Sequence, residues 1–156
     1  MKTAIIGAGA AGIFAAINTK EIFPNSEVII FEKTSKLLSK VLVSGGGRCN
    51  ITNSEQSISE FSKNYPRGGK QLKKLLGTFN NQHTINWFEK KQVVIIAEED
   101  GRMFPKSNTS KTIYDLFLSE TERLGIKINL KSGVNKLKQI GEKIQLEING
   151  QNFLFD

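Results

Sequence analysis

The chain has 156 residues, enough for one domain with a sizeable core, and an open α/β sheet with helices on both faces would use nearly all of them. Lys and Arg number 22 against 15 Asp and Glu, a net charge of +7, and the single cysteine excludes an internal disulfide and a Cys-x-x-Cys redox pair. No stretch approaches the roughly 18 apolar residues of a membrane span and no leader pattern precedes the first apolar run, so we expect a cytoplasmic protein with no membrane partner.

A glycine-rich turn follows the first apolar segment and opens an apolar helical stretch that reaches Ile22. The turn reads Gly7-Ala8-Gly9-Ala10-Ala11-Gly12. In this pattern Gly7 permits a tight turn, Gly9 lets the backbone approach a pyrophosphate, and Gly12 allows close packing of helix on strand. The small residues Ala10 and Ala11 keep the turn compact, and the start of a helix offers free N–H groups and a positive dipole end to an anion.

An acidic residue ends the next predicted strand, residues 28–31. Glu32 lies 20 positions after Gly12, where a carboxylate accepts hydrogen bonds from a ribose diol and repels a 2′-phosphate. The order strand, turn, helix, strand and acid favours a dinucleotide site over a generic α/β unit. It predicts FAD or NAD as the ligand and disfavours NADP here.

A second glycine run points to a flavin among these ligands. It follows a polar segment, residues 33–40, and reads Ser44-Gly45-Gly46-Gly47-Arg48-Cys49-Asn50-Ile51-Thr52-Asn53. Its composition predicts a loop. Consecutive main-chain N–H groups in such a loop can bind phosphate, although glycine runs also serve purely structural turns.

The middle of the chain contains predicted helices at about 70–79 and from Asn80 or Asn81 onward. Between Phe61 and Asn80 lie five basic residues and no acid, but their helical spacing favours a solvated face over a nucleic-acid patch, so we expect no nucleic-acid partner. One histidine supplies no metal-ligand set, so no metal site is predicted.

The last third of the chain returns to strands. Residues 93–97 form a predicted strand, 98–101 a turn, and 110–124 a helix that Gly125 ends. A third parallel strand is predicted at 126–130. An antiparallel meander is predicted at 134–140, 143–148 and 151–155.

Three parallel strands and a meander leave the outer edge of the first strand without a neighbour. We therefore expect residues 1–156 to be the front of a longer polypeptide whose later segments cover that edge. A short, self-sufficient protein is the competing interpretation, and it would need a homo-oligomer partner or a rearranged sheet.

Together these motifs resemble the HI0933-like flavoproteins, also called the YhiN or BaiN family, over essentially the whole chain. The matching segments are 7–12, Phe31-Glu32-Lys33, 40–53 and Asp100-Gly-Arg-Met-Phe-Pro105. The resemblance implies an α/β fold: an incomplete Rossmann-type (glutathione-reductase-like) FAD-binding domain over 1–156, with inserted helices and a terminal meander. Members are FAD-dependent oxidoreductases of about 400 residues, a size typical of two or three domains. Their next strand, ending in Ala-Thr-Gly-Gly, would follow Asp156, so the remaining strands and the substrate domain are expected beyond that residue.

The resemblance also implies the cofactor contacts. They fall on Gly7, Gly9, Ala10, Ala11, Gly12, Glu32, Lys33, Lys40, Ser44, Gly45, Gly46, Gly47, Arg48, Cys49, Asn50 and Val134. Arg48 is expected near the flavin end or its phosphates with Asn50 hydrogen-bonding nearby, and the backbone of Val134 at the adenine. For the thiol of Cys49 packing is favoured over redox chemistry.

These inferences predict the amino-terminal portion of an FAD-binding oxidoreductase in which the flavin transfers hydride or electrons. NAD(P)H is compatible with the role of a second, transient electron donor, and the substrate is a small molecule that the sequence does not identify. No side chain stands out as a general acid or base, so catalytic residues stay unassigned. The alternatives are an NAD-binding dehydrogenase domain and a catalytically silent, truncated binding module.

Overall fold

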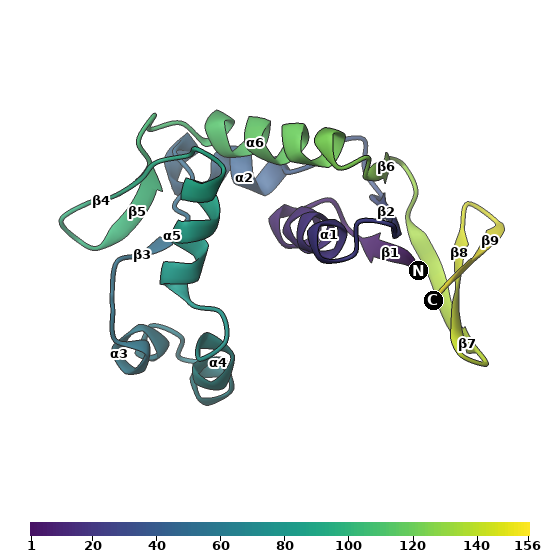
Figure 1. Cartoon of the computed structure of the whole chain (residues 1–156), viewed down its shortest axis with the longest axis horizontal. Helices are drawn as coiled ribbons and strands as arrows, with labels where there is room; N and C mark the ends of the chain where they lie inside the picture. The colour runs from purple at the N-terminus through teal and green to yellow at the C-terminus, as the bar shows by residue number, and fades with distance from the viewer. The chain divides into compact units, whose positions relative to one another are not determined.

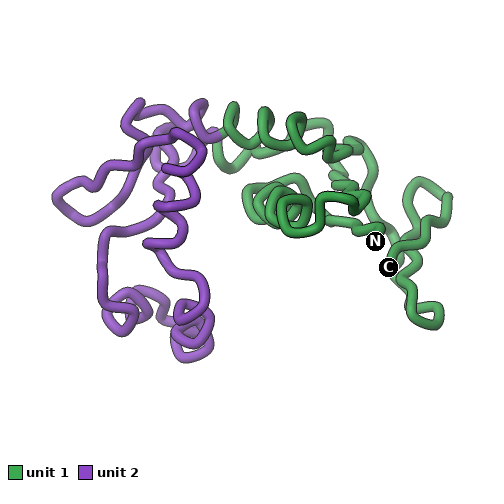
Figure 2. Tube along the Cα trace, in the orientation of Figure 1, with its two compact units in different colours: residues 1–41, 114–156 green, residues 42–113 purple.

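The computed structural model describes all 156 residues, which divide into two compact units. Unit 1 contains residues 1–41 and 114–156, and unit 2 contains residues 42–113 (Figure 2). The chain thus leaves unit 1 once and returns to it.

A parallel sheet forms the centre of unit 1 (Figure 1). Its strands are β1 (Lys2–Ile6), β2 (Glu27–Phe31) and β6 (Lys127–Asn129), in the order β1-β2-β6. The central strand β2 is buried from Val28 to Phe31, which suits its run of β-branched and aromatic side chains. The three predicted parallel strands are confirmed, and their carboxyl ends meet at one edge, where open α/β sheets bind ligands.

Helix α1 (Ala10–Ile22) joins β1 to β2 and contacts both strands. It buries Ile13, Ala16 and Ile17, which lie on one face because they are three and four positions apart. The predicted strand-helix-strand unit is therefore present.

The meander has the predicted boundaries: β7 (Val134–Ile140), β8 (Lys143–Ile148) and β9 (Gln151–Phe155) pair as antiparallel neighbours. Its Leu146, Ile148 and Phe155 form one buried cluster with Ile29 and Phe31 of β2. The Phe31 and Phe155 rings meet edge to face with centroids 5.9 Å apart. This cluster fixes the meander against one face of β2.

Strand β1 is the edge strand of the parallel sheet, as predicted. The backbone N–H of Asp156 donates to the carbonyl of Lys2 at 3.0 Å, and the N–H of Lys2 donates to the Asp156 carboxylate at 2.8 Å. Beyond Lys2 no strand pairs with the outer side of β1, and Ile6 is 55% exposed. No helix has the length and apolar character needed to cross a membrane.

Helix α6 (Ser110–Arg123) precedes β6 and begins and ends within one residue of the prediction. It buries Ile113, Phe117 and Thr121 at four-residue spacing. Gly125 follows with φ +64°, the left-handed conformation that ends many helices.

Unit 2 combines short helices with a small antiparallel sheet of order β3-β5-β4. The strands are β3 (Thr52–Asn53), β4 (Ile95–Ala97) and β5 (Arg102–Pro105); the helices are α2 (Ser39–Val43), which begins in unit 1, α3 (Ile58–Lys63), α4 (Gly69–Leu76) and α5 (Asn81–Lys90). The buried Asn81 side chain donates to the carbonyls of Asn53 and Glu55 at 2.8 and 2.5 Å, which ties α5 to β3.

Several unit 2 elements were not predicted. The sequence indicated α4, α5 and β4, whereas α2, α3, β3 and β5 were treated as connecting segments. Elements of two to six residues are too short for a periodicity to show. Strand β5 exists because both neighbours pair with it, and such long-range pairing is not visible in the local sequence.

Candidate dinucleotide-binding site

The glycine turn lies at the carboxyl end of β1 and leads directly into α1. Gly7 has φ +100°, and its N–H donates to the carbonyl of Phe31 at 2.8 Å, which holds the turn beside the end of β2. Gly9 occupies the N-cap of α1 in an extended conformation and supplies no side-chain cap. The first N–H groups of α1, from Ala10 to Gly12, are therefore available to an anion.

Gly12 and Gly9 of the turn are glycines for different reasons. A Cβ at Gly12 would overlap the carbonyl oxygen of Gly7 and lie 3.3 Å from Cγ2 of Ile5, so only glycine permits this approach of α1 to β1. A Cβ at Gly9 would meet no protein atom within 4 Å. The fold therefore requires glycine at Gly12, whereas open space at Gly9 is what a phosphate lying against the backbone needs.

Glu32 lies beside this turn. Its carboxylate accepts the N–H of Ala8 at 3.0 Å and the N–H of Thr34 at 2.8 Å. These hydrogen bonds, the Ala8 one first, hold the pKa of Glu32 below its usual range, so the carboxylate is charged at neutral pH. A fixed, charged acceptor at the end of β2 is the group that a ribose diol requires.

The segment 131–134 runs alongside residues 32–34. The N–H of Ser132 donates to the carbonyl of Glu32 at 2.7 Å, and that of Lys131 to the carbonyl of Thr34 at 2.9 Å. Val134, implied at the adenine, thus begins β7 close to Glu32, and Lys33 lies against Gly133. Lys33 and Lys40 are exposed, and Lys40 lies on α2. Unit 1 brings together the predicted turn, Glu32, Lys33 and Val134.

The second glycine run lies in unit 2 and begins with a short turn, η1 (Ser44–Gly47), whose backbone angles at Gly45 and Gly46 are left-handed rather than helical, in keeping with the predicted loop. Gly45 has φ +57°, and a Cβ there would lie 2.8 Å from the N atom of Asn50 and 2.9 Å from the Phe104 ring. Gly46 and Gly47 also have positive φ. The turn closes when the N–H of Cys49 donates to the carbonyl of Ser44 at 2.9 Å.

Cys49 and Asn50 have structural roles within unit 2. The Cys49 side chain is buried, and burial raises the pKa of its thiol, which disfavours the reactive thiolate. The Asn50 side-chain oxygen accepts the N–H of Met103 at 3.3 Å, and the N–H of Ile51 donates to the carbonyl of Met103. The run is thereby attached to β5.

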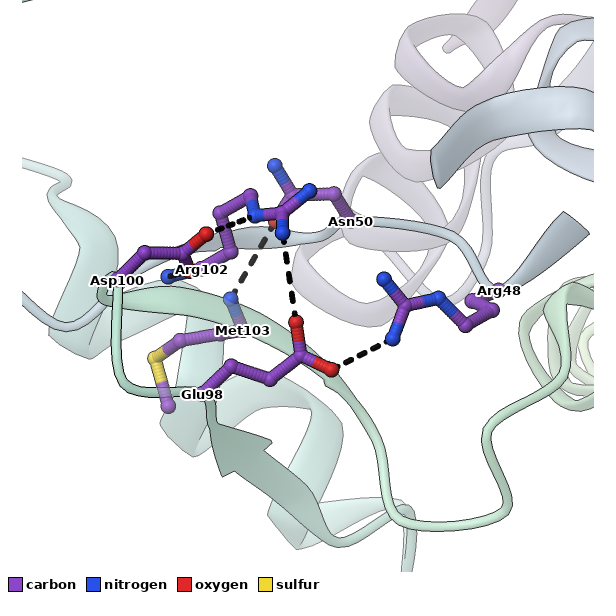
Figure 3. A network of polar contacts seen from close by, with 6 residues as sticks. All are labelled: Arg48, Asn50, Glu98, Asp100, Arg102 and Met103. Atoms are coloured by element: carbon purple, nitrogen blue, oxygen red, sulfur yellow. Dashed lines mark hydrogen bonds and ion pairs between the residues drawn. The ribbon is translucent and has the colours of Figure 1, made fainter. Parts of the chain in front are cut away.

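Arg48 is held in a network of charged side chains (Figure 3). Its guanidinium lies 2.5 Å from the Glu98 carboxylate, and Arg102 contacts the same carboxylate at 3.6 Å and Asp100 at 2.6 Å. Arg48 also stacks over the buried Phe104 ring, 4.1 Å from its centroid. The network fixes one guanidinium beside the glycine turn of unit 2.

Glu98 and Phe104 were not predicted as parts of this network. Glu98 belongs to a run predicted only as a turn, and Phe104 to a segment that matches the family but for which no strand was predicted. The alternation of apolar and polar residues was too short to indicate the β4-β5 pairing that places them near Arg48.

The residues of unit 1 fit the adenine half of a dinucleotide. The uncapped helix start can bind a pyrophosphate, the space at Gly9 admits it, and Glu32 can accept the ribose hydroxyls. The predicted contacts at Ser44–Asn50 belong to the other unit.

The chain is similar in sequence to a known protein family and to characterised proteins. The profile of the HI0933-like protein Rossmann domain matches residues 1–156. The chain is 31% identical over 149 residues to the ribosomal RNA dihydrouridine synthase of Haemophilus influenzae, covering 93% of this chain and 36% of that protein. It is 28% identical over 152 residues to the 3-dehydro-bile acid delta(4,6)-reductase of Clostridium scindens, covering 97% and 36%. The chain thus spans little more than a third of these relatives.

Among solved structures, the chain is similar to CtdE in complex with FAD and substrate 4. The TM-score is 0.54 at 18% identity, over 99% of this chain and 35% of that one. This likeness concerns the fold, which is that of FAD-binding Rossmann-type flavoproteins.

Proposed function

The chain belongs to the HI0933-like family of FAD-binding Rossmann-type oxidoreductases, and from this premise we propose that its unit 1 holds the adenine half of FAD in a reductase of conjugated carbon–carbon double bonds. The observation that carries the cofactor proposal is the placement of the Glu32 carboxylate, 3.0 Å from the N–H of Ala8 in the glycine turn. A ribose diol bound there would have its pyrophosphate at the start of α1.

The reaction class rests on what two relatives have in common. A dihydrouridine synthase saturates the uracil double bond that is conjugated to a carbonyl, and a bile acid delta(4,6)-reductase acts on double bonds conjugated to a ketone. Reduction of a conjugated double bond of this kind adds one hydride and one proton to the conjugated system. We propose the same chemistry here. NAD(P)H would be oxidised to NAD(P)⁺ as the ultimate hydride source, and FAD, once reduced by that hydride, would pass it to the substrate.

For the substrate we propose ribosomal RNA, with a steroid-type enone as the second candidate. Relatives support both, but the net charge of +7 and the isoelectric point near 9.5 suit a polyanion. This proposal competes with the prediction from helical spacing that the basic residues favour a solvated face over a nucleic-acid patch.

The residues of unit 1 would bind and orient the cofactor. Glu32 would accept the ribose hydroxyls, the helix start would bind the pyrophosphate, and the backbone at Val134 would face the adenine. In unit 2 Arg48, held by Glu98 and Phe104, is the guanidinium to which the family resemblance assigns a contact with FAD. The proton donor is not assigned to a side chain of this chain.

The free outer edge of β1 supports a further proposal about partners. Its backbone groups beyond Lys2 would pair with one more strand, from a later segment of a longer polypeptide or from a second copy. Sedimentation velocity of the purified chain separates these sources, because a second copy would give a concentration-dependent dimer.

The cofactor proposal is tested by a visible absorption spectrum of the purified chain with added FAD after gel filtration. Retention of the flavin band near about 450 nm supports it. A folded chain that retains NAD but no flavin would favour the NAD-dependent dehydrogenase alternative. A folded chain that retains neither would favour a silent binding module.

The substrate proposal is tested in the host cell, where the protein acts at its full natural length. Deleting its coding sequence should remove dihydrouridine from ribosomal RNA. Mass spectrometry of the RNA would then show uridine, lighter by two hydrogen atoms, where the parent strain has dihydrouridine. Unchanged dihydrouridine in the deletion strain would contradict the RNA substrate and leave the FAD proposal standing.

A further inference from the structure

The charge of the chain is concentrated in one segment. Residues 61–88 contain five Lys and Arg and no Asp or Glu, whereas the other residues carry 17 basic and 15 acidic side chains. The basic residues are Lys63, Arg67, Lys70, Lys73 and Lys74. The segment therefore supplies most of the net charge of +7, and the one acid on the helices that carry it is Glu60, just before the segment.

The structure places all five on one helix pair. Lys63 ends α3, Arg67 lies in the connection, and the three others lie on α4, which contacts α3. A Cβ at Gly69 would lie 3.0 Å from the carbonyl oxygen of Ser62, so the start of α4 packs closely on α3. Phe61 and Leu76 are buried. The charges thus sit on a packed scaffold rather than on a loose loop.

The basic groups are exposed and little engaged. Lys63 pairs with Glu60 at 2.7 Å, and Lys73 donates to the Ser59 hydroxyl at 3.0 Å. No carboxylate pairs with Arg67, Lys70 or Lys74. A polyanion could therefore be bound without first breaking ion pairs, apart from the exposed contact of Lys63.

An anionic membrane is less suited to this surface than a nucleic acid. Helix α4 has only eight residues, and of its three leucines Leu76 is buried, Leu72 is partly buried and only Leu75 is exposed. Interfacial binding needs a continuous apolar face beside the charges. Binding of RNA needs only regularly available cations for the phosphates.

We propose that this α3–α4 basic surface, the five residues named above, binds the phosphate backbone of the RNA substrate. The inference rests on the proposed function, since it gives the site at which the proposed substrate would be held. These contacts would position the RNA without reading its sequence.

The test is fluorescence anisotropy of a labelled, uridine-rich single-stranded RNA of about 12 nucleotides, within the site sizes of single-strand binding folds, titrated with the chain at several KCl concentrations. The triple variant K70Q/K73Q/K74Q is compared with K90Q/K106Q/K138Q, which removes the same charge from exposed lysines elsewhere. We expect the first variant to bind the RNA at least about tenfold more weakly. The slope of log K against log[KCl] should become shallower by about 2, because each of the three lost phosphate contacts contributes roughly 0.7. The control should stay within about twofold, and both should keep the circular dichroism and FAD uptake of the wild type.

Equal losses in the two variants would overturn the inference, because only net charge would then matter. It would also be overturned by unchanged RNA binding in the first variant, or by binding to phosphatidylserine vesicles that excludes RNA. If gene deletion removes dihydrouridine but any of these results is obtained, the proposed function stands. Only the assignment of RNA binding to the α3–α4 basic surface is then rejected.

Discussion

The two units present themselves to a ligand in different ways. Unit 1 carries 11 basic and 9 acidic residues, and its candidate site consists of main-chain N–H groups, glycine carbon atoms and one carboxylate. Unit 2 carries 11 basic and 6 acidic residues, and its notable features are guanidinium and ammonium groups. Recognition by the backbone demands close steric fit, whereas recognition by exposed charges tolerates variation. Substitutions in the two units should therefore differ in their effects on stability and binding.

The largest effect is expected at Gly12 in unit 1. In Gly12→Ala the new Cβ overlaps the Gly7 carbonyl, and because backbone rather than a flexible side chain must move, the free energy of unfolding should fall by about 3 kcal/mol. Urea denaturation measures this change.

Gly9→Ala is the matched control. Its Cβ meets nothing in the protein, so the free energy of unfolding should fall by no more than about 1 kcal/mol, the cost of alanine at an N-cap, while FAD binding weakens. If both variants lost stability equally, the distinction between a packing glycine and a ligand glycine would be wrong.

The next effect concerns Gly45 in unit 2. Gly45→Ala combines a left-handed φ with a Cβ less than 3 Å from Asn50 and Phe104, and should cost about 2 to 3 kcal/mol. Gly46→Ala has the same backbone strain without a close contact and should cost about 1 kcal/mol. Equal unfolding free energies for the two variants would show that contact with Phe104 contributes nothing.

A smaller effect is expected from the charged network. Glu98→Gln removes the carboxylate shared by Arg48 and Arg102, but because these groups are about one-third or more exposed, the loss should be at most about 1 kcal/mol. The unfolding free energy should recover part of the difference in high salt, which screens the repulsion between the two guanidinium groups. A loss that does not depend on salt would contradict the electrostatic account.

The smallest effect is the pH dependence of Glu32. Its pKa is lowered in the folded chain by the N–H groups of Ala8 and Thr34, so its contribution to stability is fully present above the ordinary carboxyl pKa of about 4.3 and is lost as pH falls through the folded pKa. Wild type should therefore be more stable than Glu32→Gln at pH 7, with the difference disappearing in acid. Denaturation at a series of pH values checks this, and a constant difference would refute it.

How far the sequence predicted the structure also differs between the units. In unit 1 the meander boundaries, the parallel strands and the position of Glu32 followed from local patterns, because each long element carries its own periodicity. In unit 2 no local pattern indicated that Glu98 and Phe104 surround Arg48, because their proximity depends on β4-β5 pairing. The family resemblance implied a role for Arg48 but not the residues that hold it.

Calorimetric titration of FAD into the wild-type chain and into Glu32→Gln tests the central claim most directly. The account predicts binding of one FAD per chain that weakens about tenfold or more in the variant, as expected for a lost charge-assisted hydrogen bond worth roughly 1.5 to 3 kcal/mol, with the circular dichroism unchanged. Equal affinity in both proteins, or no FAD binding by a folded wild type, would contradict the assignment of unit 1 as the adenine site.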